Sequence, residues 1–204
     1  MSLQATEPRL VLASASASRR AVLQGAGLAF EARPAAVDEE AIKLAAQAEG
    51  LPAGEAALLL AAAKAERIAR RDPEALVIGC DQLLVCGPRW FDKPVGMAGA
   101  AEHLRALSGQ AHVLETATVA WRGGRQVWQH LERPRLTMRP LSDAFIAAYL
   151  ALEGEAVLGS VGAYRLEGPG VHLFSRVEGE HSAILGLPLL PLLEFLRGHG
   201  VVLR

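Results

Sequence analysis

The segment Ser14–Arg20, SASASRR, combines small side chains with two adjacent arginines. It follows the apolar run Leu10–Leu12 and precedes a helical pattern, which predicts a strand-to-helix turn. Small side chains let a ligand approach the backbone amides, and a helix N-terminus attracts anions. The hydroxyls of Ser14, Ser16 and Ser18 add donors, and Arg19 and Arg20 suit a phosphate chain. The alternative interpretation is a serine helix cap followed by a solvated arginine pair.

A carboxylate and two further cations are candidates for the same chemistry. Asp81 follows the apolar run 75–80 and is expected at the carboxyl end of a central strand, where open α/β sheets bind ligands. Lys64 interrupts the apolar stripe of a helix expected over 55–71, where a snorkelling side chain is the alternative. Lys93 lies in a loop stiffened by Pro94. A triphosphate carries about four negative charges, so several cations and Mg²⁺ suit its binding.

Composition predicts a soluble cytoplasmic protein that binds neither nucleic acid nor membrane. Hydrophobic residues make up 51% of the 204 residues, and the formal net charge is −1. A nucleic-acid-binding protein is expected to be basic. Two cysteines make no disulfide framework, and no signal peptide or apolar run of about 18 residues is present. P-loop, Rossmann and serine-hydrolase motifs are also missing from the sequence.

The alternation of strand-like and helix-like segments predicts an α/β fold of mixed α+β character with a mixed sheet. Gly123-Gly124 predicts the turn of a hairpin between two long antiparallel strands. Strands are expected over 9–13, 29–33, 75–79 with a continuation at 83–85, 112–121, 126–138 and 171–176. Helices are expected over 18–27, 55–71, 97–107, 142–152 and 189–196.

A set of short motifs resembles the Maf family of nucleotide pyrophosphatases in both content and order. The matching segments are LASASASRR (12–20), VDE (37–39), KA (64–65), IGCDQ (78–82), DKP (92–94), SGQAHVLET (108–116), GAYRLEG (162–168) and GLPL (186–189). Two positions depart from the family pattern. Ala17 stands where proline is usual, and Asp92 stands where glycine is common.

The resemblance implies a single domain over residues 1–204, with two lobes on an extended mixed sheet around a deep nucleotide groove, as in Maf and ITPase-like folds. It implies that the family's reaction, hydrolysis of the α–β phosphate bond to monophosphate and pyrophosphate, takes place here. Residues implied to bind the phosphates are Ser16, Arg19, Arg20, Lys64 and Lys93. Glu39 and Asp81 are implied to bind Mg²⁺ or Mn²⁺, with Asp81 as general base.

One alternative to this reading of the family stays open, and the family also suggests an oligomeric state. The family's older name, septum formation inhibitor, suggests a non-catalytic nucleotide-binding regulator of cell division, although the retained carboxylates favour the enzyme. A homodimer is also expected, because family members often form one and because the hairpin at Gly123-Gly124 and the apolar C-terminal stretch both need cover.

Three positions are expected to select the base, since they differ between branches of the family. Here they are Ser18, Gln82 and Glu167, and the last two match the branch that hydrolyses 7-methyl-GTP. The carboxylate of Glu167 can accept hydrogen bonds from the N1–H and exocyclic amine of a guanine. Ser18 departs from that branch, which tends to carry an aromatic residue there. We therefore expect a preference for 7-methyl-GTP over dTTP and UTP.

Overall fold

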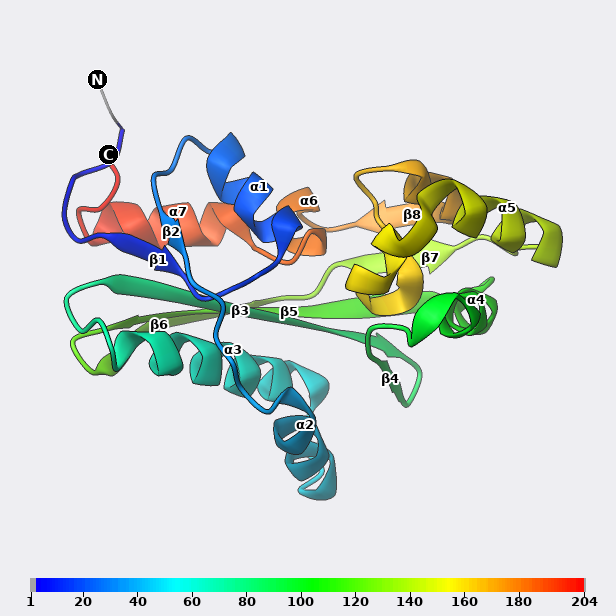
Figure 1. Ribbon diagram of the computed structural model, residues 1–204, viewed down its shortest axis with the longest axis horizontal. Helices are drawn as coiled ribbons and strands as arrows, with labels where there is room; N and C mark the ends of the chain where they lie inside the picture. Colours follow the sequence, from blue (N-terminus) through cyan, green and yellow to red (C-terminus); the bar gives the residue numbers. More distant parts are fainter. Residues whose placement is uncertain (1–2, 204) are drawn as a thin grey trace. The chain divides into compact units, whose positions relative to one another are not determined.

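The computed structural model describes residues 3–203, in which eight strands form one mixed sheet (Figure 1). The order is β2-β1-β3-β5-β7-β8, and β4 pairs with β3 while β6 pairs with β5. Pairs β1–β2 and β1–β3 are parallel, whereas β3–β4, β5–β6, β5–β7 and β7–β8 are antiparallel. The strands are β1 (Leu10–Leu12), β2 (Glu31–Ala32), β3 (Leu76–Cys86), β4 (Arg89–Phe91), β5 (Ala111–Arg122), β6 (Arg125–Glu132), β7 (Arg135–Met138) and β8 (Phe174–Glu178).

Seven α-helices lie between or beside these strands in residues 3–203, which confirms the mixed α/β fold class. They are α1 (Ala17–Gly25), α2 (Glu39–Ala48), α3 (Ala53–Ala69), α4 (Gly96–Leu107), α5 (Asp143–Glu153), α6 (His181–Ile184) and α7 (Leu189–Gly198). Three 3₁₀ helices follow α5, namely η1 (Gly154–Gly159), η2 (Val161–Ala163) and η3 (Pro169–Leu173). Within the described part of the chain, no helix is long and apolar enough to cross a membrane.

The chain divides into two compact units. Unit 1 comprises the residues up to Asp81, Thr116–Glu132 and the residues from His181 onward, and unit 2 comprises Gln82–Glu115 and Arg133–Glu180. Strands β3 and β5 therefore contribute residues to both units. A single domain over residues 1–204 stays a prediction.

Unit 1 has helices on both faces of its parallel strands (Figure 1). Successive strand residues point to opposite faces, so each strand contributes to two cores. Leu12 and Ile78 pack in one core with Phe195 of α7 and with residues of α1. Val11 and Val77 pack in the other core against the alanine-rich face of α3. Because both faces are covered, these strands read as continuous apolar runs in the sequence.

The expected hairpin is confirmed. Gly123 and Gly124 form its turn with φ of 57° and 74°, which suits glycine, and β5 pairs with β6 on either side. Trp128 of β6 stacks on Phe195 of α7, with ring centroids 5.0 Å apart. The hairpin and the apolar C-terminal stretch thus cover each other within unit 1. Dimerisation, which the need to cover them suggested, stays a prediction.

Two expected strands are wrong in extent. The strand expected over 126–138 is interrupted, because β6 ends at Glu132 and β7 begins at Arg135. Pro134 lies in the break and has no N–H to donate to a sheet. The strand expected over 171–176 begins only at Phe174, because residues 169–173 form η3.

Candidate active site

Asp81 lies inside β3, so the prediction that it ends a strand is wrong. The strand continues to Cys86 because its last residues pair with β4. The parallel ladder with β1, however, ends at Ile78, whose carbonyl accepts a hydrogen bond from the N–H of Ala13 at 2.8 Å. Asp81 therefore follows the last parallel pairing, beyond the carboxyl end of β1, where α/β sheets bind ligands.

The structure brings Asp81, Lys64 and Glu39 together in unit 1 as an acid–lysine cluster. Lys64 Nζ lies 2.5 Å from Asp81 Oδ1 and 2.8 Å from Glu39 Oε1. Asp81 and Lys64 are buried, with 6% and 8% of their surface exposed, whereas the Glu39 side chain is 48% exposed. Buried charges need such partners because they lose their hydration.

A close approach of α3 to β3 makes this pairing possible. A Cβ on Gly79 would lie 2.1 Å from the carbonyl oxygen of Ala61 and 2.9 Å from the Cβ of Ala65. Only glycine at this position lets the helix backbone come so near the strand. Gly79 and Asp81 are two residues apart in a strand and so face the same helix, from which Lys64 extends.

Replacing Gly79 by alanine is expected to destabilise the fold by about 1–3 kcal/mol or more, since the new methyl group overlaps the backbone of α3. Urea unfolding measures this loss as a lower midpoint. The control is Gly25→Ala in α1, where nothing lies within 4 Å of the added Cβ. There we expect no loss, or a gain of up to about 1 kcal/mol. Equal midpoints for the two variants would contradict the close approach.

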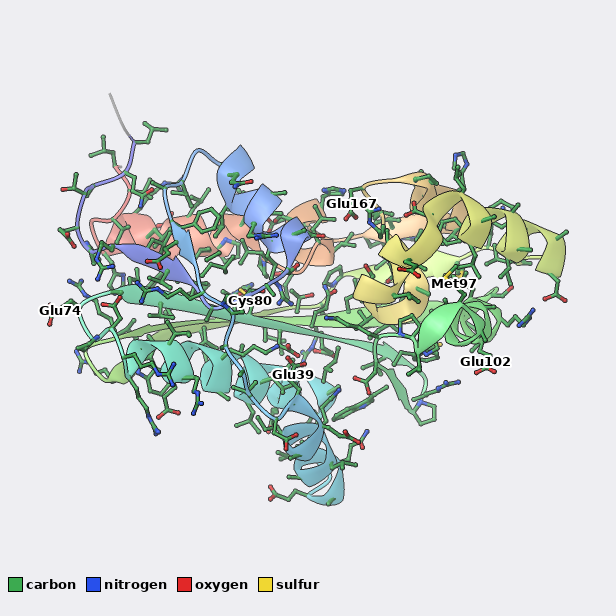
Figure 2. The ribbon with its side chains drawn as sticks, in the orientation of Figure 1. Glu39, Glu74, Cys80, Met97, Glu102 and Glu167 are labelled. Carbon is green, nitrogen blue, oxygen red and sulfur yellow. The ribbon has the colours of Figure 1, made fainter. Side chains whose placement is uncertain are left out.

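The position of Glu39 is fixed by the N-terminal cap of α2. The carboxylate of Asp38 accepts a hydrogen bond from the N–H of Ala41 at 3.0 Å and so begins α2. Glu39, labelled in Figure 2, is then the first residue of that helix, and its carboxylate contacts Lys64. The segment VDE therefore contributes one acid to the helix start and one acid to the cluster.

The segment of residues 14–16, called the serine turn below, caps α1. Ser16 Oγ accepts a hydrogen bond from the N–H of Arg19 at 3.4 Å, and Ser14 Oγ accepts one from the N–H of Ser16 at 3.2 Å. Helix α1 consequently begins at Ala17, one residue earlier than expected. The capping interpretation of Ser16 is confirmed, and its contact with a phosphate stays a prediction.

The two arginines of the turn have different surroundings. Arg19 Nε donates to the carbonyl of Gly186 at 2.8 Å, and Nη1 donates to the carbonyl of Cys80 at 3.0 Å and to Ser14 Oγ at 3.3 Å. Arg20 is exposed, and no hydrogen bond or ion pair joins its side chain to another residue of the described part of the chain. The solvated-pair interpretation is therefore wrong for Arg19.

The predicted site residues are divided between the units. Unit 1 contains Ser16, Ser18, Arg19, Arg20, Glu39, Lys64 and Asp81, and unit 2 contains Gln82, Lys93 and Glu167. Lys93 is exposed in the loop between β4 and α4. Glu167, labelled in Figure 2, lies between η2 and η3 with its Oε1 3.6 Å from Arg165 Nε. Figure 2 also labels Cys80, the residue before Asp81 on β3.

Sequence reasoning missed Gly79 and Gly186, and it gave the backbone of Cys80 no role. Both glycines stand inside family-like motifs, which is the signal that could have singled them out. Burial raises the pKa of the Cys80 thiol, which disfavours the thiolate that nucleophilic chemistry needs. Its value to the site is the carbonyl group that Arg19 binds.

The donor set around Lys64 fits a magnesium or manganese ion. No group of three or more His, Cys, Asp or Glu side chains that could hold a metal ion gathers in residues 3–203. Mg²⁺ instead uses one or two carboxylates together with substrate phosphates and water. Glu39 and Asp81 supply two carboxylates that already converge on one cation, Lys64.

A family model described as Maf-like protein matches residues 9–199. The chain belongs to the Maf family. It is 54% identical over 191 residues to the nucleoside triphosphate pyrophosphatase of Granulibacter bethesdensis, covering 94% of this chain and 97% of the relative. It is 53% identical over 196 residues to the 7-methyl-GTP pyrophosphatase of Rhizobium meliloti, covering 96% and 98%. For this Maf protein, the resemblance in the ordered motifs is thereby confirmed over nearly its whole length.

Proposed function

We propose that this Maf protein is a nucleoside triphosphate pyrophosphatase, a hydrolase acting on a phosphorus anhydride. Water adds to the α-phosphorus, the bond to the α–β bridging oxygen breaks, and that oxygen leaves with pyrophosphate. The observation that carries the proposal is the buried pairing of Asp81 with Lys64 beside Glu39. The names of the two relatives support the reaction class.

Asp81 is the group that takes the proton from the attacking water. Its Oδ1 is held by Lys64, and residues 3–203 offer no hydrogen-bond donor to Oδ2, which we assign to the water. Lys64 fixes the orientation of the carboxylate. Burial of both groups strengthens their interaction, because little water screens it.

Glu39 and Asp81 would hold a divalent ion, Mg²⁺ or Mn²⁺. When bound, such an ion supplies positive charge that neutralises the phosphate oxygens as the anhydride breaks. Both carboxylates already contact one cation, Lys64, which supports a cation-binding role for them. The ammonium group of Lys64 stays with the carboxylates and holds them together.

The phosphate chain is proposed to contact Ser16, Arg20 and Lys93. For Lys93 the proposal rests on the family resemblance alone. In Arg19, Nε and Nη1 donate hydrogen bonds to protein acceptors, so Nη2 is the nitrogen left to donate to a substrate. Arg20, by contrast, is exposed.

Arg20→Ala is expected to raise KM and to weaken triphosphate binding more than monophosphate binding. Each lost charge-assisted contact weakens binding by roughly 1.5–3 kcal/mol. Isothermal titration with a triphosphate and with its monophosphate measures the difference. Arg71→Ala, which removes another exposed arginine of unit 1, is the control and should change neither value. Equal weakening of both ligands by Arg20→Ala would show that the side chain serves the fold or the base.

The base is proposed to be 7-methylguanine, selected by Glu167 and Gln82. Ser18 offers no aromatic ring on which this base could stack. We expect wild-type kcat/KM for 7-methyl-GTP to exceed the values for dTTP and UTP. Glu167→Gln should reduce that preference, because the amide N–H of glutamine is a donor and would face the N–H donors of the guanine edge. Glu155→Gln, at an exposed position of unit 2, is the control. Faster hydrolysis of dTTP or UTP by the wild type would refute the base assignment and leave the reaction class intact.

The experiment that tests the reaction class is a nucleotide panel incubated with the protein and Mg²⁺ or Mn²⁺. Release of monophosphate and pyrophosphate from at least one nucleotide is expected. If no nucleotide yields these products, the non-catalytic regulator becomes the better explanation. A cytoplasmic location and a homodimeric state remain predictions.

A further inference from the structure

The side chain of Arg19 connects three segments of unit 1 that are far apart in the sequence. Its guanidinium group donates to Ser14 in the serine turn, to the carbonyl of Cys80 on β3 and to the carbonyl of Gly186 after α6. The acceptors Cys80 and Gly186 lie 61 and 167 residues from Arg19 in the chain. Hydrogen bonding to three segments of the protein is a structural role, which differs from binding a phosphate.

The contact with Cys80 bears directly on Asp81. The carbonyl oxygen of Cys80 belongs to the peptide group that also contains the nitrogen and Cα of Asp81, and that group is planar. Holding the oxygen therefore restricts the backbone from which the Asp81 side chain extends. Lys64 holds the same side chain at its far end. Asp81 is thus restrained both at its backbone and at its carboxylate.

Gly186 gives the guanidinium group room to lie against the chain. A Cβ at this position would meet Arg19 Nε at 3.0 Å, Nη2 at 3.4 Å and Cζ at 3.5 Å. The backbone of Gly186 also has φ of +95°, which side chains rarely adopt. Replacing this glycine consequently disturbs Arg19 without removing any charge.

We propose that Arg19 is a positioning residue that holds Asp81 and the serine turn in register, while Arg20 is the arginine that binds the phosphate chain. This inference rests on the proposed function, because it assumes that Asp81 takes part in the reaction. Three donors in one rigid plane serve three acceptors, which the single flexible ammonium of lysine does not reproduce. A phosphate contact needs only a nearby cation, and lysine supplies one.

The test is the charge-conserving variant Arg19→Lys, with Arg71→Lys, at an exposed arginine of unit 1, as its control. Turnover is measured as pyrophosphate release from the nucleotide that the wild type hydrolyses fastest. Binding is measured with an analogue of that nucleotide carrying a methylene group between the α- and β-phosphorus. Arg19→Lys should lower kcat about 10- to 100-fold with the Kd of the analogue within about 3-fold, because a displaced catalytic group slows the reaction rather than binding. Arg71→Lys should leave both kcat and the Kd of the analogue unchanged.

Gly186→Ala provides a second perturbation that leaves both arginines in place. It should lower kcat in the same way as Arg19→Lys. Gly27→Ala is its matched control, since Gly27 also has a positive φ, +70°, but nothing lies within 4 Å of an added Cβ. Gly27→Ala should leave kcat unchanged.

The inference is overturned if Arg19→Lys keeps wild-type kcat, if it weakens analogue binding as its main effect, or if Gly186→Ala behaves like Gly27→Ala. Thermal melting of each variant checks that the chain is folded. If Gly186→Ala does not fold, Arg19→Lys decides the question alone. An inactive wild type would overturn the proposed function, whereas an active wild type with a tolerated Arg19→Lys overturns this inference only.

Discussion

Asp81→Asn is expected to lower kcat by about 10²-fold or more while the Kd of a non-hydrolysable nucleotide changes only a few-fold. The amide has nearly the same shape as the carboxylate, so the strand and its packing are kept. It has no basic oxygen of comparable strength, so it does not accept the proton of the attacking water. It is also a poorer ligand for a divalent ion. Steady-state pyrophosphate release and analogue titration measure the two effects.

Asp72→Asn is the matched control for this variant. Asp72 belongs to the same unit, and its side chain is 11% exposed against 9% for Asp81. It pairs with Arg33 at 2.8 Å and with Arg9 at 2.9 Å. Its replacement should leave kcat unchanged. A fall in kcat of similar size for both variants would mean that loss of any largely buried acid disturbs the fold, and that Asp81 has no special role.

Lys64→Met is expected to destabilise the fold by roughly 3–5 kcal/mol and to abolish turnover. Asp81 would then be buried without its cation, and breaking a buried ion pair at one partner leaves an uncompensated charge. Methionine retains much of the apolar stem, so the loss measures charge rather than packing. Urea unfolding with and without the substitution gives the difference in free energy.

The double variant Lys64→Met, Asp81→Asn distinguishes this cause from a packing defect. With the buried carboxylate also removed, part of the lost stability should return, so the double variant should unfold at a higher urea concentration than Lys64→Met. Strictly additive losses would contradict the pairing as the source of the effect. A loss below about 1 kcal/mol in the single variant would do the same.

The pairing of Lys64 with Asp81 could be anticipated from charged residues in unusual places, whereas Glu39 was implied only by the family resemblance. Lys64 in an apolar helical stripe and Asp81 after an apolar run both indicated buried charges, and the structure pairs them. The strand expected over 75–79 with a continuation at 83–85 corresponds to β3, but Asp81 was not expected inside it. Glycine and aspartate are poor strand residues, yet β3 lies between β1 and β5 and pairs with β4 at its end, so it runs through Gly79 and Asp81 to Cys86.

The hydrogen-bond partners of Arg19 could not be predicted from the sequence, for a different reason. Two of its three acceptors are backbone carbonyls, which every residue possesses, and the carbonyl of Gly186 comes from the other end of the chain. Helix α2 was missed although Asp38 is a good helix cap, because the acidic VDE segment was assigned only to chemistry. Strand β4 has three residues, which is too short for a periodic signal.

Hydrolysis in water enriched in ¹⁸O tests the central claim most directly, because it identifies the phosphorus atom that is attacked. Wild-type protein, Mg²⁺ and 7-methyl-GTP, or the nucleotide hydrolysed fastest in the panel, are incubated, and ³¹P spectra of the products locate the label. The account predicts ¹⁸O in the nucleoside monophosphate, unlabelled pyrophosphate, and little of either product from Asp81→Asn. Label in the pyrophosphate, or release of orthophosphate and a diphosphate, would contradict it.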